Sequence, residues 1–451
     1  MRSISRGFRS NTYNYGASFS YFWITSRVLC KRYGSSLVRI GPNDLTTDNP
    51  DVIRMISSAK SIYRMGEANT GNRFNPYNET MFEILEPERH DQMKAKVAAA
   101  YSGRDTPGLE SNVDEQIKSL IHLIRRKCIY RAVDSRTLSI GRISGLFALD
   151  VISSVSLGTA FGCLQNDADI HGVFFSTLHV HIPFMSVAVD VPWLRRLFCS
   201  DMFLRLMGPK ETDAYSIDIY LLHARISDDL LIETYEGLFI RHGLSQADCE
   251  SEALLMFIAR SDTTASVIRI TMPHVLSSQQ VYQKLKEEIK RAVTDGKISS
   301  TITNAEARAL PYLQAVIYES LRIRPVVSDL VFKEVPANDG TAIGTNLPSF
   351  LLNEDIFEED SHIFRPERFM KLNSTTLSEM CRNVELQFGY GRWMCAGKPL
   401  AQMELNKLPF ELFRNFDFQL VDPQNPMSSK SFVLWVDDGL EVRVTESDSG
   451  V

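Results

Sequence analysis

The sequence has no stretch that is both long and apolar enough to predict a membrane-spanning helix. Such a helix needs about eighteen or more apolar residues in a row, and none of the 451 residues begins a run of that length. The nearest candidate, residues 19–30, is short and is interrupted by Thr25, Ser26 and Arg27. We therefore expect no clear anchor in this chain.

Acidic residues are missing from the start of the sequence. Residues 1–43 contain no Asp or Glu but carry several Arg and Lys side chains. An acid-free, basic start resembles an organellar presequence. The alternatives are a basic surface segment that contacts anionic lipid, or a chain start without its anchor. We treat residues 1–33 as a basic N-terminal segment and 34–451 as a single domain.

Positive charge is not in excess overall, and paired cysteines are absent. The formal net charge is -6, which argues against a nucleic-acid partner. The seven Cys are scattered with no CxxC spacing, as expected for reduced thiols in a reducing compartment. Dinucleotide-binding, phosphate-loop and nucleophile-elbow motifs are also missing, so nucleotide or acyl chemistry within the chain has no support.

Apolar residues recur mostly at helical spacing, which predicts a mainly α fold with a minor β portion. No Pro-, Gly- or Ser-rich linker divides the chain. Asn49 before Pro50 is typical of a helix start. The predicted helices are 87–101, 113–130, 139–160, 250–294 and 303–324. The predicted strands are 37–40, 331–335 and 432–444.

One cysteine, Cys395, has a distinctive setting. It follows a loop with glycines at 389 and 391, and an amphipathic helix begins directly after Gly397. A helix N-terminus favours a thiolate, and glycines let a flat ligand approach the backbone. A thiolate beside an aromatic such as Phe388 suits a haem iron. The alternative is a buried Cys in a glycine-rich turn.

This loop resembles the haem-binding signature FxxGxRxCxG of the cytochrome P-450 superfamily, with Phe388, Gly391, Cys395 and Gly397 in place. The Arg of that signature is replaced by Trp393, and Arg392 stands one position earlier. The resemblance implies the cytochrome P-450 fold, with haem b between an oxygen-activating helix and the Cys-ligand loop. It implies that Cys395 is the axial ligand, and that Arg392 is the candidate contact to a haem propionate.

A second motif lies in a predicted helix. Glu319 and Arg322 form an ExxR pair, whose usual meaning is a weak surface ion pair. Further along the chain, Arg368 follows in the segment 364–369. The resemblance implies that the three residues form a buried structural triad behind the haem loop.

A third motif interrupts the apolar helix of residues 254–269 with polar residues. Burying polar groups in such a run costs free energy unless they are hydrogen-bonded, so their presence here favours a functional role. The segment resembles the superfamily's oxygen-activating helix, AGxDTT. Ala259 and Thr263 share one face at i and i+4. The resemblance implies that Ala259 faces the haem, that Thr263 hydrogen-bonds the activated oxygen, and that Asp262 gates proton delivery.

Arg260 departs from the superfamily, which prefers Gly at this position. The side chain could enter the substrate cavity and hold a carboxylate, or it could extend away from the haem. It could also block oxygen. These alternatives stay open from the sequence.

His90 and Lys94 match a helix of the superfamily in which Trp or His precedes Arg by four residues and faces a haem propionate. Lys provides a point charge where Arg would be bidentate. The region 334–356, where the family usually has a strand pair and a long loop, is short. We expect this shortening to disturb the wall of the substrate pocket.

The resemblance implies a haem-dependent monooxygenase that uses O2 on a small apolar, secondary-metabolite-type substrate. Electrons would come from a separate NADPH-cytochrome P-450 reductase, docked near Lys94, Arg392 and Lys398. The substrate would contact residues 57–82, 177–189 and the Arg260 helix. The cytosolic face of the endoplasmic reticulum, with peripheral membrane contact, is the expected location. A reductase-independent isomerase or dehydratase, and a non-catalytic haem-binding relative, are the alternatives.

Overall fold

The architecture is described from a computed structural model of the chain. The structure describes residues 33, 35–72, 79–103, 106, 108–127, 129, 136–172, 179–180, 182–198, 200, 202–203, 206, 235–335, 340–370 and 373–447. The predicted basic N-terminal segment lies outside the described residues, Tyr33 excepted.

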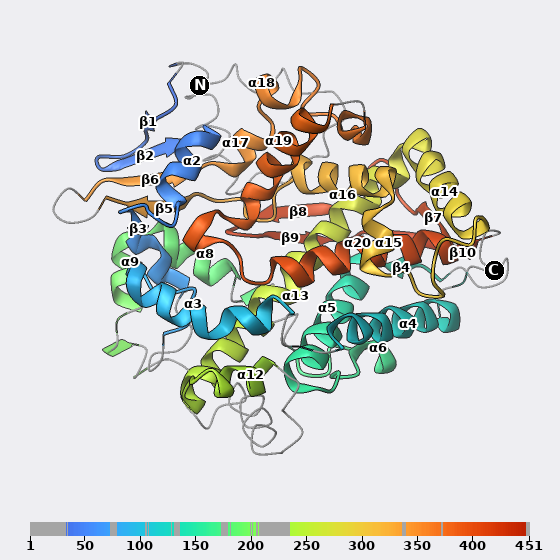
Figure 1. The fold of residues 1–451 in the computed structure, drawn as a ribbon, viewed down its shortest axis with the longest axis horizontal. Coiled ribbons are helices and arrows are strands. Elements are labelled where there is room, and N and C mark those ends of the chain that lie inside the picture. Colours follow the sequence, from blue (N-terminus) through green and yellow to red (C-terminus); the bar gives the residue numbers. More distant parts are fainter. Residues whose placement is uncertain are drawn as a thin grey trace.

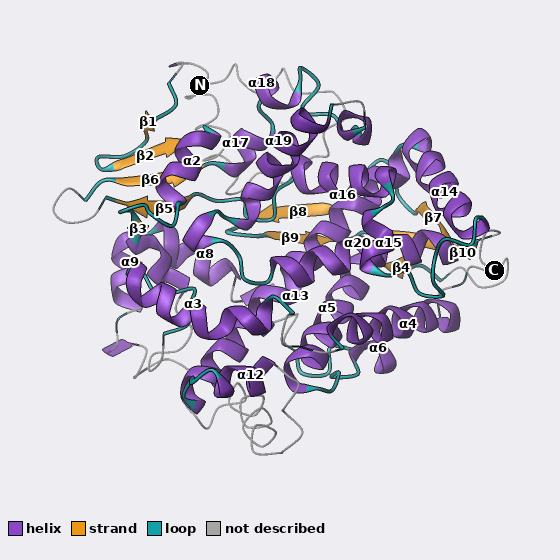
Figure 2. Ribbon diagram, viewed as in Figure 1, coloured by secondary structure: helices purple, strands orange, loops and turns teal. Residues whose placement is uncertain are grey.

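Helices form most of the described chain (Figure 2). In the first half they are α2 (Pro50–Ser57), α3 (Pro87–Tyr101), α4 (Leu109–Lys127), α5 (Ile140–Leu157), α6 (Cys163–Asn166), α8 (Ile182–Asp190), α9 (Pro192–Phe198) and α12 (Tyr235–Arg241). In the second half they are α13 (Gln246–Ser277), α14 (Gln279–Thr294), α15 (Asn304–Arg308), α16 (Pro311–Ile323), α17 (Leu347–Leu351), α18 (Glu354–Phe357), α19 (Ser374–Val384) and α20 (Lys398–Asn415). The 3-10 turns are η1 (Glu67–Asn72), η4 (Pro366–Phe369), η5 (Glu385–Phe388) and η6 (Gly391–Trp393).

The strands of the described part form small sheets of five, three and two strands, in the orders β1-β2-β6-β5-β3, β4-β10-β7 and β8-β9. Their bounds are β1 (Val38–Arg39), β2 (Asp44–Thr47), β3 (Arg64–Met65), β4 (Leu138–Ser139), β5 (Val331–Glu334), β6 (Ala342–Thr345), β7 (Phe416–Leu420), β8 (Ser428–Ser431), β9 (Trp435–Asp438) and β10 (Glu441–Glu446). The predicted mainly α fold with a minor β portion is confirmed.

Capping side chains define the helix boundaries at Asn49 and Ser278. The side chain of Asn49 accepts the N–H groups of Asp51 and Val52, so it caps α2 as predicted. The helix predicted over 250–294 is divided at Ser278, whose extended backbone ends α13 and whose hydroxyl caps α14. Serine commonly caps a helix because its short side chain can accept a backbone N–H.

The short region after β5 still forms a strand pair. Strand β5 pairs with β6 in antiparallel register, from Val331 opposite Thr345 to Glu334 opposite Ala342. Strand β6 also runs parallel to β2, so both of its edges are paired. These strands lie together at one end of the molecule (Figure 1). The short region therefore keeps the strand pair, and its expected effect on the wall of the substrate pocket stays a prediction.

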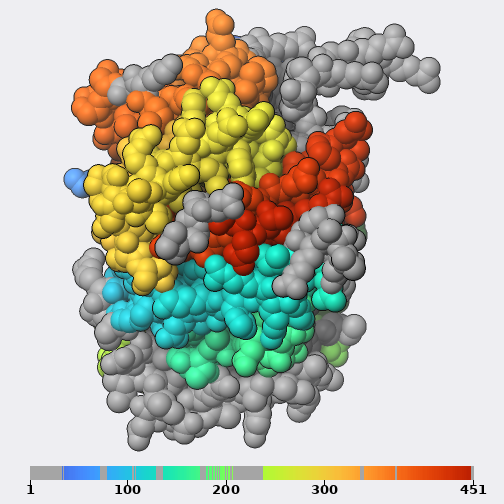
Figure 3. All heavy atoms as spheres, turned by 90° about the vertical axis from the view of Figure 1, so that its right-hand side faces the viewer, coloured from blue at the N-terminus to red at the C-terminus, as the bar shows by residue number. Residues whose placement is uncertain are grey.

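The long helix α13 passes through the middle of the molecule and packs against α5, α16 and α20 (Figure 1). Helix α5 is long and apolar enough to cross a membrane, but 89% of it is buried inside the fold. It is therefore a core helix here, consistent with its packing on α13. A side view shows the residues of α14, the C-terminal strands and α4 lying against one another on this face (Figure 3).

Candidate functional site

The loop before α20 is tightly folded and leaves the thiol of Cys395 exposed. The Cys395 N–H donates to the Phe388 carbonyl, with 2.6 Å between N and O. Gly389 and Gly391 have φ of 75° and 57°, a region that favours glycine. A Cβ on Gly391 would lie 2.5 Å from the Ser57 carbonyl oxygen. The loop therefore needs glycine here in order to pack against the end of α2.

Helix α13 is buried along most of its length but opens on one face. Ala259 is exposed and Thr263 is half-buried, whereas most of their neighbours are buried. The two residues are four positions apart and so share one side of the helix. Gly397, beside Cys395, contacts the adjacent Arg260 of α13. The loop that carries Cys395 therefore lies next to the part of α13 that contains Ala259 and Thr263.

Asp262 does not share this open face. It is fully buried and ion-pairs with Arg269 of the same helix, which also lies 3.4 Å from Asp437 in β9. Arg324 completes the network with a bidentate pair to Asp437 at 2.7 and 2.6 Å. Burial raises the pKa of Asp262, and the positive charge of Arg269 opposes that rise. Its Oδ2 has no partner among the described residues, so one carboxylate oxygen remains available.

Arg260 is held by a partner that the sequence did not indicate. Its Nη2 lies 2.6 Å from Oε2 of Glu404 in α20, and both side chains are buried. Burial raises the pKa of Glu404, while the charge of Arg260 opposes the rise. The guanidinium is therefore engaged by the protein itself, rather than presented to a substrate carboxylate.

His90 and Lys94 of α3 both lie against the Cys395 loop. The His90 ring packs against Trp393 in a tilted arrangement, with centroids 4.3 Å apart. Lys94 Nζ donates to the carbonyls of Arg392 and Met394 at 2.7 and 2.6 Å. Burial lowers the pKa of His90 to about 4, helped by the charge of Lys94. His90 is thus neutral at neutral pH and Lys94 braces the loop backbone.

Lys333 and the indole N–H of Trp393 complete this cluster, and sequence analysis missed Lys333. Lys333 of β5 is 3% exposed, and its Nζ lies 4.4 Å from the centre of the Trp393 ring. Burial lowers the pKa of Lys333 to about 7. In the described part of the chain, Lys333 has no carboxylate partner and Trp393 Nε1 has no hydrogen-bond partner. A single Lys in a short strand gives no signal in the sequence.

The side chain of Arg392 contacts Asp91 and the backbone of Ala59. Its Nε lies 3.1 Å from Oδ2 of Asp91, and its Nη2 donates to the Ala59 carbonyl at 2.8 Å. Its charge is thus paired with Asp91, and the described contacts do not support its predicted role toward a propionate. Lys398 is likewise paired, with Glu385 at 2.9 Å. Neither residue is a free cation for a docking partner.

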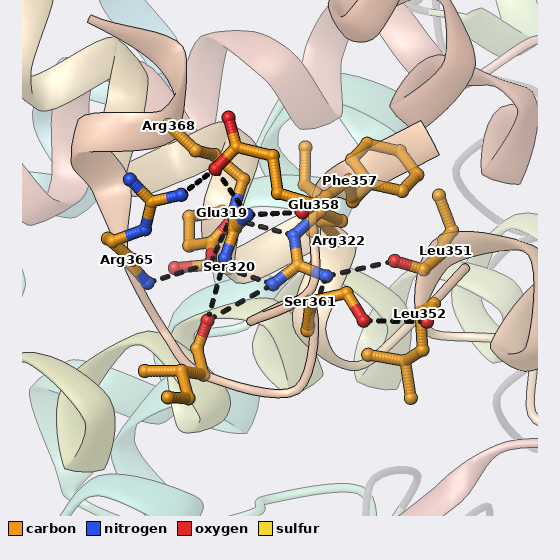
Figure 4. Close-up of polar contacts among 12 residues, drawn as sticks. Glu319, Ser320, Arg322, Leu351, Leu352, Phe357, Glu358, Ser361, Arg365 and Arg368 are labelled. Carbon is orange, nitrogen blue, oxygen red and sulfur yellow. Dashed lines mark hydrogen bonds and ion pairs between the residues drawn. The ribbon is translucent and has the colours of Figure 1, made fainter. Parts of the chain in front are cut away.

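The ExxR motif forms the predicted buried triad (Figure 4). Arg322 contacts both carboxylate oxygens of Glu319 at 2.7 Å, and Arg368 Nε lies 3.2 Å from each of them. Glu319 also accepts the backbone N–H of Arg365 at 2.8 Å. Arg322 in turn donates to the carbonyls of Leu351 and Ser361. The triad therefore ties α16 to the segments before and within η4.

These residues fit a haem group. The exposed thiol of Cys395 supplies the donor that a haem iron takes from a cysteine. Lys333 contacts only the Met65 sulfur and the Trp393 ring among the described contacts, and the buried indole N–H of Trp393 has no acceptor there; both donors suit carboxylates such as the haem propionates. The open face at Ala259 and Thr263 lies on the adjacent helix. The predicted alternative of an inert buried Cys does not match its exposure.

The predicted substrate-contacting segments are described only in part. Residues 73–78, 173–178 and 181 lie outside the described residues. The Met81 N–H donates to Glu252 near the start of α13, so the segment around Met81 lies beside that helix. Burial raises the pKa of Glu252 to about 7. One predicted wall of the pocket is therefore next to α13.

Comparisons with known proteins agree with this site. The family model described as Cytochrome P450 matches residues 31–442 of this chain. The chain is 43% identical to the cytochrome P-450 monooxygenase aba1 of Botryotinia fuckeliana, over 96% of this chain and 90% of that protein. It is 38% identical to the monooxygenase abl1 of Leptosphaeria maculans, over 92% and 79%. It is 26% identical to a pisatin demethylase of Fusarium vanettenii, over 87% and 78%. The chain therefore belongs to the cytochrome P-450 family and is a monooxygenase of that family.

Proposed function

We propose that Cys395 is the axial ligand of haem b and that the protein oxidises a small apolar, secondary-metabolite-type substrate with O2. The observation that carries this proposal is the exposed thiol just before α20, next to the segment of α13 on which Ala259 and Thr263 form an open face. The haem would supply oxygen activation, promoted by electron donation from the sulfur. The similarity to fungal monooxygenases supports the proposed class of substrate.

The chain's own residues would control protons and the orientation of the cofactor. Thr263 places a hydroxyl on the open face, where it can donate a hydrogen bond and pass on a proton. Asp262, buried next to Thr263 in the sequence, would gate the delivery of that proton, with Oδ1 held by Arg269 and Oδ2 unpaired among the described residues. Lys333, Trp393 and His90 would bind the propionates, and Lys94 would fix the loop.

Electrons would come from a separate NADPH-cytochrome P-450 reductase, because the sequence contains no flavin or nicotinamide motif. The pairing of Arg392 and Lys398 with acidic residues removes two of the cations expected to attract that partner. The isomerase alternative rested on Arg260 as a site residue. Its pairing with Glu404 removes that support.

Reductase dependence tests the reaction. The haem-loaded full chain is incubated with NADPH, a fungal reductase, isotopically labelled O2 and panels of terpenoid, polyketide and indole compounds. We expect at least one product that carries a single labelled oxygen atom, and no product when the reductase is omitted. Product formation without reductase would contradict the monooxygenase proposal and favour an isomerase or dehydratase.

We also propose peripheral contact with the cytosolic face of the endoplasmic reticulum through α8 and α9. These helices pack together and expose Phe184, Val187, Trp193 and Leu197. Trp193 is 66% exposed, and Arg196 beside it is also exposed. An apolar face with aromatic and basic side chains is typical of helices that lie at a lipid surface.

Vesicle binding tests this contact. The variant with Phe184→Ala and Trp193→Ala is expected to bind mixed neutral and anionic vesicles at least tenfold more weakly, because each apolar side chain contributes about 1.5–3 kcal/mol on burial. Ile363→Ala, at an exposed apolar residue on another part of the surface, is the control and should bind like the native chain. Equal binding by all three proteins in a flotation assay would refute the proposal.

A further inference from the structure

Two carboxylates and two guanidinium groups form a buried network on one side of α13. Asp262 and Arg269 belong to α13 itself. Asp437 lies on β9, and Arg324 directly follows α16. Each of these side chains belongs to a residue that is at most 5% exposed, and the formal charges of the set balance. The network therefore links the helix that carries Thr263 to two distant parts of the chain.

Arg269 is shared by the two carboxylates. Its Nη2 ion-pairs with Oδ1 of Asp262, and its Nε lies 3.4 Å from Oδ2 of Asp437. The same Oδ2 of Asp437 lies 2.6 Å from Nη2 of Arg324. A Cβ on Gly141 would lie 3.8 Å from Cδ of Arg269 and 3.7 Å from the Asp437 carbonyl oxygen, so the start of α5 closes over this contact. Two carboxylates thus compete for one guanidinium, and Arg324 limits how strongly Asp437 competes.

The charges of the network act on Asp262 in opposite directions. Burial raises the pKa of Asp262, Arg269 and Arg324 oppose that rise, and Asp437 adds to it. Burial alone would raise the pKa of Asp437 too, but Arg324 lowers it to about 2. Asp437 is therefore charged at neutral pH. A neighbouring anion disfavours the ionised form of a carboxyl group, and a neighbouring cation favours it.

Other charged side chains on α13 and on the elements that pack against it have their described contacts elsewhere. These contacts join Arg260 with Glu404, Arg142 with Asp167, Asp150 with the N–H groups of Cys163 and Leu164, Asp417 with Lys286, and Glu319 with Arg322. The acidic residues near the start of α13, Asp248, Glu250 and Glu252, lie about three turns or more before Asp262. Burial lowers the pKa of His274 on the same helix to about 4, so its ring is neutral at neutral pH.

We infer that Asp437 and Arg324 are positioning residues that act through Arg269 and set how readily Asp262 holds and releases a proton. The inference rests on the proposed function, in which Asp262 gates the proton that reaches Thr263. In the native chain Arg269 is divided between two carboxylates. Without Asp437, Arg269 would serve Asp262 alone and hold it as the anion. Without Arg324, Asp437 would draw Arg269 to itself, and Asp262 would keep its proton to higher pH.

A purely stabilising network predicts a different result. Asp437→Asn and Arg324→Gln break the same bidentate ion pair. Both variants should therefore melt at a lower temperature, because each leaves a buried charge without its partner. Only the positioning role predicts that the two variants change the protonation of Asp262 in opposite directions.

Infrared titration of the haem-loaded full chain measures the proton on Asp262. The protonated carboxyl C=O band that is absent from Asp262→Asn is followed against pH in each protein. We expect the midpoint of this band to fall by about one pH unit or more in Asp437→Asn and to rise by about as much in Arg324→Gln, since a neighbouring charge shifts a carboxyl pKa by about 1–3. Shifts in the same direction, or no shift in either variant, would overturn the inference.

Two control variants separate charge from general loosening. Arg324→Lys keeps the positive charge but loses the bidentate geometry, so it should melt at a lower temperature with a midpoint close to the native one. Asp417→Asn removes a carboxylate from β7, which also packs against α13, but Asp417 contacts Lys286 and Tyr282 rather than Arg269. Its midpoint should equal the native one. A shift in Asp417→Asn as large as in Asp437→Asn would refute the assignment.

The double variant Arg324→Gln with Asp437→Asn covers the case in which a single variant does not fold. It removes both members of the ion pair, so neither is left buried and unpaired. Arg269 then has Asp262 as its one carboxylate partner among the described residues. We expect a midpoint below that of the native chain but above that of Asp437→Asn. An unchanged midpoint in the double variant would count against the inference.

The amount of product formed per NADPH consumed, measured against pH with the reductase, connects this charge to the reaction. Asp262 passes on a proton in its protonated form, so the ratio should fall as pH rises through the midpoint of its band. This fall should move to lower pH in Asp437→Asn and to higher pH in Arg324→Gln. If the infrared midpoints move but the ratio does not follow them, Asp437 and Arg324 are not positioning residues of the reaction.

Failure of the inference and failure of the proposed function give different results. Product formation by the native chain with unshifted infrared midpoints in the variants would overturn the inference and leave the proposed function standing. If no protein in the series forms product although the midpoints shift as expected, the proposed function is wrong, and the role of the network in the reaction is wrong with it.

Discussion

Replacing Cys395 with serine is expected to abolish the absorption band of the reduced, carbon-monoxide-bound protein that gives the family its name. The hydroxyl fits the space of the thiol, so the loop held by the Cys395 N–H and the Phe388 carbonyl should remain folded. Its oxygen does not donate electrons to the iron as a thiolate does. We expect product formation to fall at least a thousandfold, equivalent to about 4 kcal/mol.

The matched control is Cys381→Ser. Cys381 is a free, half-buried thiol on α19, outside the loop. Burial raises the pKa of Cys381 to about 11, which disfavours the thiolate that a haem iron would bind. This variant should keep the band and the activity. Retention of the band in Cys395→Ser, or its loss in Cys381→Ser, would contradict the assignment of the ligand.

Replacing Glu319 with glutamine is expected to destabilise the protein by about 3–5 kcal/mol, because the buried guanidinium of Arg322 would lose its counter-charge and that of Arg368 would keep only partly exposed carboxylates, of which Asp360 is the nearest. Glu319 and Arg322 are fully buried and Arg368 is 1% exposed. The triad also fixes the chain that leads into η4 through the N–H of Arg365. We expect lower resistance to urea and a reduced haem content.

The variant Asp51→Asn tests whether burial explains the loss of stability expected for Glu319→Gln. Asp51 and Arg54 form another pair at i and i+3, with 3.3 Å between charged atoms, but the Asp51 side chain is 90% exposed. Exposed pairs contribute about 0–1 kcal/mol, so this variant should unfold almost like the native chain. Similar urea midpoints for Glu319→Gln and Asp51→Asn would show that the triad is not a major stabilising element.

Features that depend on neighbouring residues could be predicted from the sequence. Helix α3 occupies the predicted residues 87–101, and Asn49 caps α2 as its position before Pro50 suggested. The glycines around Cys395 and the ExxR spacing are local as well. Strand pairing is not local. Residues 342–345 gave no strand signal, because β6 exists through its pairing with β2 and β5.

By itself, the sequence determined the mainly α composition, the position of the Cys395 loop and the shared face of Ala259 and Thr263, since helical periodicity and turn chemistry act over a few residues. Only the tertiary structure decided the partners of the charged residues. Arg260 meets Glu404 from a helix far along the chain, and Lys333 meets Trp393 across two separate elements. The partner of a buried charge depends on such long-range contacts. Burial makes an unpaired charge costly, and the group that pairs with it can come from any part of the fold.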